Sequence, residues 1–161
     1  MLVLRADDGW NTSVIDNGST DIGVWRPTPP AYLSGGNPQW ANRDPFALSS
    51  PDQFLPEGPP DLTSRAYARA LKQVQLLAEA DSVIRTAEQT EIARFWGYGS
   101  GASTPPEAWN EIATEIAQQE GLSLTETAKL LAVLNVAEAD GAIAAWNAKY
   151  SYDTWRPVTA I

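Results

Sequence analysis

The sequence predicts an all-α protein in which a bundle of helices follows a long irregular segment. Pro and Gly occupy 15 of the first 60 positions but only eight of the remaining 101, and both residues break regular structure. After residue 60, apolar side chains recur at the three- and four-residue spacing of amphipathic helices. No segment alternates polar and apolar residues cleanly enough to predict a strand. We therefore divide the chain into residues 1–60, which are irregular, and residues 61–161, which are helical.

The charge balance and two missing residue types exclude several classes of function. Asp and Glu number 20 against 11 Lys and Arg, a net charge of −9, which argues against binding to nucleic acid or to anionic lipid. The chain contains no Cys and no His, so disulfides, thiol catalysis, a Ser-His-Asp triad and His-ligated metals are excluded. No apolar run approaches the ~20 residues of a membrane span. We expect neither a nucleic-acid partner nor a membrane span.

The irregular part is richer in aromatic side chains than an ordinary linker. Its Trp and Phe residues are Trp10, Trp25, Trp40, Phe46 and Phe54. The segment is either a disordered leader or an extended segment that packs these side chains on the helical body. We favour packing, because solvated linkers seldom contain Trp.

The helical part begins with two amphipathic segments. The first helix is predicted from about Asp61 to Ala80, with Asp61 or Thr63 as its N-cap. The second begins near Thr86, which forms a capping box with Gln89. The apolar side chains expected to be buried are Tyr67, Ala70, Leu71, Val74, Leu77 and Ala78 on the first helix, and Ile92, Phe95 and Trp96 on the second.

A third helix is predicted after a glycine-rich break. Gly97 to Gly101 ends the second helix. Thr104 then caps the third, with Pro105 at the first helical position, where the missing N–H costs nothing. Gly121 ends this helix. Its apolar stripe is Trp109, Ile112, Ala113 and Ile116.

The fourth helix opens with a capping box of Ser123 and Glu126 and is apolar on nearly every face. Its apolar residues are Leu130, Leu131, Val133, Leu134, Val136, Ala137, Ile143, Ala144 and Trp146. Such a helix is expected to be central and covered by the others. Asp140 interrupts the apolar run, and it either pairs with an Arg or Lys or lines a pocket. We favour the structural ion pair, because a buried carboxylate needs a partner.

Two cations at the end of this helix form a candidate anion site. Lys149 and Arg156 are seven residues apart, close to two helical turns, and Pro157 predicts a turn of the chain after Arg156. The ammonium and the planar guanidinium suit a phosphate-like oxyanion. Trp155 and Tyr152 are the expected pocket walls. The alternative is a lysine that meets the helix dipole beside an ordinary surface arginine.

The spacing of Lys149, Arg156 and Pro157 resembles the first signature of the vanadium-dependent haloperoxidase and type 2 phosphatidic acid phosphatase superfamily, which is Lys, six residues, then Arg-Pro. Further segments resemble bacterial haloperoxidase-like proteins in the same order along the chain. These segments are residues 24–30, 45–54, 85–96, 104–110 and 155–161. The resemblance therefore covers nearly the whole chain.

This resemblance implies a helical bundle of the haloperoxidase and acid phosphatase type, incomplete in this chain. It implies that Lys149 and Arg156 hold the oxygens of vanadate, or of phosphate in a phosphatase. In the oxidases vanadate activates hydrogen peroxide, whose oxygen passes to a halide to give hypohalous acid; in the phosphatases a His attacks phosphorus. The expected substrates of the parent enzyme are thus hydrogen peroxide and halide, or a phosphoester.

The chain also departs from the family pattern. The family has a second signature with Ser-Gly-His and a third with Arg and a further His, and this chain contains no His. We therefore assign no catalytic residue here. We expect a fragment truncated before these motifs, inactive by itself, without tight vanadate binding, and prone to self-association through apolar helix faces.

Three functions are compared on these grounds. The first is a fragment of a vanadate-dependent haloperoxidase, which the resemblance of the leader favours. The second is a fragment of a soluble acid phosphatase with the same first signature. The third is an acidic helical interaction module without catalysis. The compartment stays open: parents of this kind are often exported, and the absence of Cys allows export without showing it.

Overall fold

The computed structural model describes residues 3–98 and 103–161, and this part of the chain is built of helices without a named strand. The 3₁₀ helices are η1 (Val3–Arg5) and η2 (Pro38–Asn42); the α-helices are α1 (Arg65–Ala78), α2 (Ala87–Trp96), α3 (Pro105–Gln119), α4 (Leu124–Tyr152) and α5 (Pro157–Ala160). The all-α prediction is confirmed. No described helix has both the length and the apolarity needed to cross a membrane.

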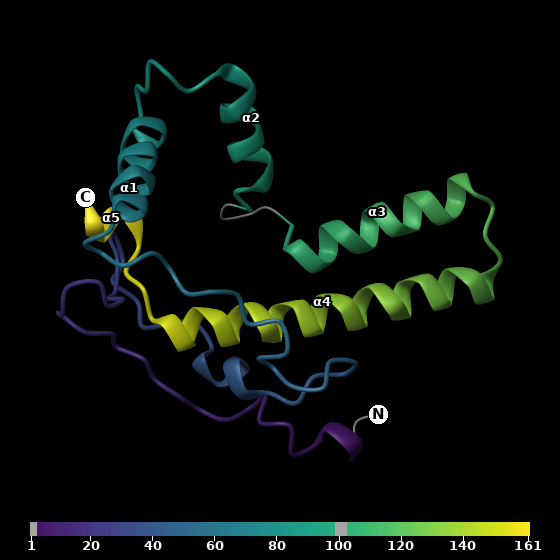
Figure 1. The fold of residues 1–161 in the computed structure, drawn as a ribbon. Helices are drawn as coiled ribbons and strands as arrows, with labels where there is room; N and C mark the ends of the chain where they lie inside the picture. Colours follow the sequence, from purple (N-terminus) through teal and green to yellow (C-terminus); the bar gives the residue numbers. More distant parts are fainter. Residues whose placement is uncertain (1–2, 99–102) are drawn as a thin grey trace.

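The helices α3 and α4 form an antiparallel hairpin (Figure 1). The capping box of Ser123 and Glu126 starts α4 as predicted, with the Ser123 N–H donating to the Glu126 carboxylate at 2.8 Å. The connecting turn contains Gly121 at φ +63°, a left-handed conformation that favours glycine. Across the hairpin, Asn110 and Asn135 exchange side-chain hydrogen bonds of 2.9 and 3.3 Å. These contacts hold α3 along the first half of α4.

The start of α1 differs from the prediction. The N-cap is Ser64, whose hydroxyl accepts a hydrogen bond from the Tyr67 N–H at 3.1 Å, and neither Asp61 nor Thr63 has that role. Asp61 instead accepts hydrogen bonds from the backbone and hydroxyl of Thr63 in the turn before the helix. Any of these three residue types can cap a helix, so the sequence alone did not select among them.

The helix α2 begins at the predicted capping box of Thr86 and Gln89. It ends at Trp96, and residues 99–101 of the predicted glycine-rich stop lie outside the described residues. The prediction that Ile92, Phe95 and Trp96 are buried is wrong, because 51%, 68% and 51% of their surfaces are exposed. The Trp96 ring of α2 lies beside that of Trp109 on α3, with ring centroids 6.3 Å apart, but Ile92 and Phe95 remain more than half exposed, so most of the apolar face of α2 is uncovered.

Apolar side chains of α3 and α4 are also exposed to solvent. The α3 stripe is only partly buried: Ala113 is inside, whereas Trp109 and Ile116 are 43% and 49% exposed. On α4, Ile143 is buried but Val133 is 61% exposed. The prediction that α4 is covered by its neighbours is therefore wrong for this face. The amphipathic helices α1 and α2, which were expected to cover α4, do not pack on it (Figure 1).

The irregular N-terminal segment runs along the side of α4 opposite α3 (Figure 1). Trp40 in η2 packs on Trp146 with ring centroids 5.5 Å apart, and Asn147 donates to the Ala41 carbonyl at 2.9 Å. Nearer the start of α4, the carboxylate of the buried Asp140 accepts hydrogen bonds from backbone N–H groups of the segment. Trp10 and Phe54, in contrast, are 58% and 69% exposed.

Asp140 forms no ion pair within the described chain. Its carboxylate accepts three backbone N–H hydrogen bonds, from Phe46 at 2.6 Å, Ala47 at 2.7 Å and Leu48 at 3.0 Å. The predicted ion pair is therefore wrong: backbone donors satisfy the carboxylate. Burial alone would raise the pKa of Asp140, but these three hydrogen bonds and the charge of Arg5 outweigh burial and leave the pKa below its ordinary value.

Candidate functional site

The candidate site begins where α4 ends. Asp153 adopts a left-handed conformation at φ 42° and ψ 43°, and its N–H donates to the Lys149 carbonyl at 3.1 Å. Asp is among the few residue types that tolerate this conformation. The turn that follows α4 is therefore at Asp153, whereas the sequence predicted it at Pro157. Arg156 is extended, and Pro157 is the first residue of α5.

The turn after α4 is held by the N-terminal segment. Val24 and Thr154 form an isolated antiparallel bridge. On either side of it, the Trp25 N–H donates to the Asp153 carbonyl at 2.8 Å and the Trp155 N–H donates to the Gly23 carbonyl at 2.9 Å. These bonds keep the chain extended up to Arg156 and bring Trp25 beside the end of α4.

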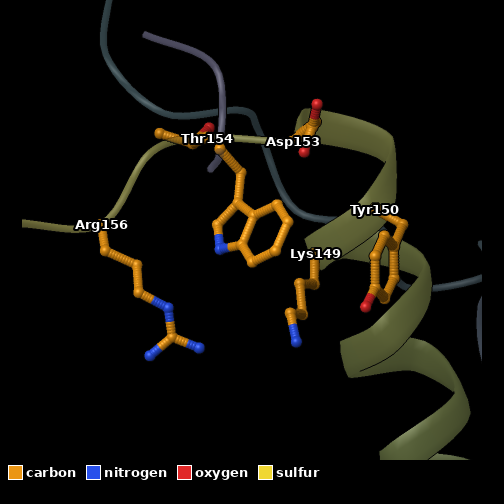
Figure 2. A pocket seen from close by; sticks show the side chains of 6 residues that line it. Lys149, Tyr150, Asp153, Thr154 and Arg156 are labelled. Carbon is orange, nitrogen blue, oxygen red and sulfur yellow. The ribbon is translucent and has the colours of Figure 1, made fainter. Parts of the chain in front are cut away.

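The two predicted cations line one pocket. Its volume is about 240 Å³, and it is lined by Trp25, Lys149, Tyr150, Asp153, Thr154 and Arg156. The side chains of Lys149 and Arg156 extend from the backbone toward the same side (Figure 2). Within the described chain, neither side chain has a carboxylate within ion-pair distance. The pocket is open to solvent, since both cations are exposed while Trp25 is buried.

The charges in this pocket act on one another. Partial loss of hydration lowers the pKa of the Lys149 ammonium, although much of the side chain is exposed, and the nearby charge of Arg156 lowers it further. Asp16, in the N-terminal segment, opposes this lowering. Burial raises the pKa of Asp153, and Asp16 adds to the rise. The two cations that line the pocket therefore repel each other, and a bound anion would relieve this repulsion.

Two predicted pocket walls point elsewhere. Trp155 donates its indole N–H to the Tyr67 hydroxyl at 2.7 Å and thereby fastens the turn to α1. The Tyr152 hydroxyl donates to the Pro56 carbonyl. Neither side chain lines the pocket of the cations. The aromatic walls are instead Trp25 and Tyr150, neither of which was predicted from the sequence.

Asp153 is the one carboxylate among the residues that line the pocket, which therefore offers two cationic donors and not a set of metal ligands. The indole N–H of Trp25 is buried and has no acceptor among the described residues. The ammonium of Lys149 and the guanidinium of Arg156 make a donor pair that fits an oxyanion. In the described segments, no group of three His, Cys, Asp or Glu residues is placed to hold a metal ion.

Comparisons with known proteins cover this site and most of the chain. Residues 129–161, which include Lys149 and Arg156, match the family model described as the VCPO second helical-bundle domain. The vanadium chloroperoxidase of Curvularia inaequalis is 32% identical over 135 residues, covering 72% of this chain and 22% of that protein. The crystal structure of the first bacterial vanadium-dependent iodoperoxidase has a TM-score of 0.75 and 35% identity, covering 86% of this chain and 35% of that one. This chain therefore spans a minor part of the length of either relative.

Proposed function

Because the chain belongs to the vanadium haloperoxidase-like proteins, we propose that Lys149 and Arg156 supply two ligands of the vanadate site in a peroxide-driven halide oxidase. The observation that carries this proposal is the shared pocket of the two cations, neither of which has a described carboxylate partner. Exposed cations are often without a carboxylate partner, but these two meet at one cavity. Two unpaired cations beside one cavity are suited to an anion from solution.

The residues of the pocket have distinct tasks in this proposal. Arg156 offers a planar pair of N–H donors to two oxygens, and Lys149 offers a compact charge to another. Together they offset the negative charge that develops on the oxygens during the reaction. Trp25 covers one wall and limits the access of water. Vanadate, when bound, supplies the centre that activates hydrogen peroxide toward a halide.

The comparisons favour an oxidase over the acid phosphatase. The chloroperoxidase and the iodoperoxidase are both named for halide oxidation with vanadium. The two cations would serve either reaction, because both act on an oxyanion. Peroxide and halide are therefore the proposed substrates.

We expect the 161-residue chain by itself to bind vanadate weakly and to catalyse neither reaction. The site is open to solvent, where charged contacts are screened, and the chain lacks a His to act as ligand or nucleophile. Titration with millimolar orthovanadate, followed by ⁵¹V NMR, should show saturable broadening that inorganic phosphate reverses. Lys129→Ala, which removes an exposed lysine near the start of α4, is the matched control and should broaden the signal equally.

Two results would refute these expectations. Absence of broadening by the wild-type chain, or broadening that phosphate leaves unchanged, would remove the support for an oxyanion site. Measurable bromination by the chain with vanadate, peroxide and bromide would disprove the inactivity.

We also propose that the chain self-associates through its uncovered apolar side chains. Ile92, Phe95 and Trp96 on α2 and Val133 on α4 are each more than half exposed, and contiguous exposed apolar surface drives association. Sedimentation velocity at rising concentration should show the average sedimentation coefficient increase. A concentration-independent monomer with a sharp cooperative melt would contradict this prediction.

A further inference from the structure

Lys149 lies between two aromatic rings of its own helix. Its ammonium nitrogen is 5.1 Å from the ring centroid of Trp146 and 5.1 Å from that of Tyr150. Figure 2 shows the Tyr150 ring beside the Lys149 side chain. Neighbouring residues of an α-helix diverge around its axis and do not face each other. The helix alone therefore does not explain why the Tyr150 ring reaches Lys149.

Both rings are fastened to one carbonyl group of the N-terminal segment. The Trp146 indole N–H and the Tyr150 hydroxyl each donate to the Gly36 carbonyl, and both hydrogen bonds are 2.9 Å long. A carbonyl oxygen has two lone pairs, and this one accepts both aromatic donors. Burial raises the pKa of Tyr150, with Asp16 adding to the rise, so its hydroxyl stays protonated and able to donate.

The segment that carries this carbonyl is itself held against the site. The Gly35 N–H donates to the Asp16 carbonyl at 2.8 Å. A Cβ added at Gly35 would lie 2.8 Å from the Tyr150 hydroxyl oxygen and 2.9 Å from the Asp16 carboxylate. Both contacts are with the ends of side chains, so a methyl group at this position would push Tyr150 or Asp16 away. The observed place of Tyr150 against the backbone therefore depends on glycine at position 35.

We propose that the Gly36 carbonyl, through Trp146 and Tyr150, positions the Lys149 ammonium for oxyanion binding; the assignment of the anion rests on the proposed function above. Cation–π contacts with two rings hold the ammonium in place. A carboxylate would hold it as well, but it would also cancel the charge that the anion needs. Trp146 and Tyr150 are thus positioning residues, which act on the anion through Lys149.

The proposal can be tested by NMR of the chain labelled with ¹³C-lysine. The sequence contains three lysines, Lys72, Lys129 and Lys149, and the variant Lys149→Arg assigns the signal of the third. In the wild-type chain, ring currents should shift the Lys149 Hε signals upfield of the other two lysines. Tyr150→Phe removes one anchoring hydroxyl and keeps the ring. It should move these signals toward the exposed lysines and weaken vanadate binding several-fold.

Gly35→Ala should have the same effect, because the new methyl group displaces Tyr150. Gly141→Ala is the matched control: it is the same substitution on the helix that carries Lys149, and its Cβ meets nothing within 4 Å. It should leave the Lys149 signals unchanged. If Gly35→Ala fails to fold, Tyr150→Phe decides the question.

The outcomes separate this proposal from the proposed function. Wild-type Lys149 signals that coincide with those of Lys72 and Lys129, or that stay upfield in Tyr150→Phe, would overturn the positioning role. Upfield signals that respond to Tyr150→Phe support that role. If the same signals do not respond to vanadate or phosphate, the positioning stands and the oxyanion function fails.

Discussion

Asp140→Ala is expected to lower the free energy of unfolding by about 3–5 kcal/mol, because it leaves three backbone donors without their acceptor. The N–H groups of Phe46, Ala47 and Leu48 converge on this one carboxylate, and each is a charge-assisted hydrogen bond in a partly buried place. Urea denaturation followed by tryptophan fluorescence measures the loss. Asp52→Ala, which removes an exposed carboxylate of the same segment, should change stability by less than about 0.5 kcal/mol. Equal losses in both variants would contradict the prediction.

The pH dependence of stability gives an independent test of Asp140. Its pKa in the folded chain lies below the ordinary value of 3.8, so the ionised carboxylate stabilises the fold. This contribution is complete above about pH 3.8 and disappears as the pH falls through the lowered pKa. Asp140→Asn lacks the titrating group, so its stability should decline less steeply in acid than that of the wild-type chain. Parallel acid limbs for the two proteins would show that Asp140 does not contribute.

The second large effect is expected at the cations themselves. Arg156→Ala and Lys149→Ala should each weaken vanadate binding about 10-fold to 100-fold, because each removes charge-assisted hydrogen bonds to the anion. In the ⁵¹V titration this loss abolishes the broadening over the millimolar range. Arg156→Lys keeps the charge but loses the planar fork, so its affinity should be intermediate.

The same variants separate anion binding from association. Neither cation belongs to the exposed apolar faces of α2 and α4, so sedimentation should be unchanged in both alanine variants. Unaltered vanadate affinity in Arg156→Ala would refute the oxyanion role. If the chain is instead an interaction module without an anion site, Arg156→Ala should leave both the response to vanadate and the self-association of the chain unchanged.

Local patterns in the sequence predicted the helix starts well. The capping boxes at Thr86 and Ser123 involve side chains and backbone within four residues, so the sequence contains all the information that they need. The N-cap of α1 was missed because Asp61, Thr63 and Ser64 can all act as caps. The exposed faces of α2 and α4 were missed because periodicity shows that a face is apolar, not whether another element covers it.

The candidate site was predictable only in part. The spacing of Lys149 and Arg156 pointed to an oxyanion, and the structure brings both side chains to one pocket. Trp25 and Tyr150 were missed, because their places depend on hydrogen bonds between segments more than 100 residues apart. The partners of Asp140 were missed for a related reason: backbone N–H groups are present at almost every residue and leave no mark in a sequence.

The antiparallel bridge between Val24 and Thr154 also has a consequence for the order of folding. The bridged residues lie about 130 positions apart, and closing so long a loop is entropically costly and slow compared with local pairing. The α3–α4 hairpin, whose contacts are close in sequence, is expected to form first. Trp25 then reaches its buried place late, so the pocket is among the last parts of the molecule to assemble. The pocket that Lys149 and Arg156 line is expected to be complete only after the N-terminal segment has paired with the turn that follows α4.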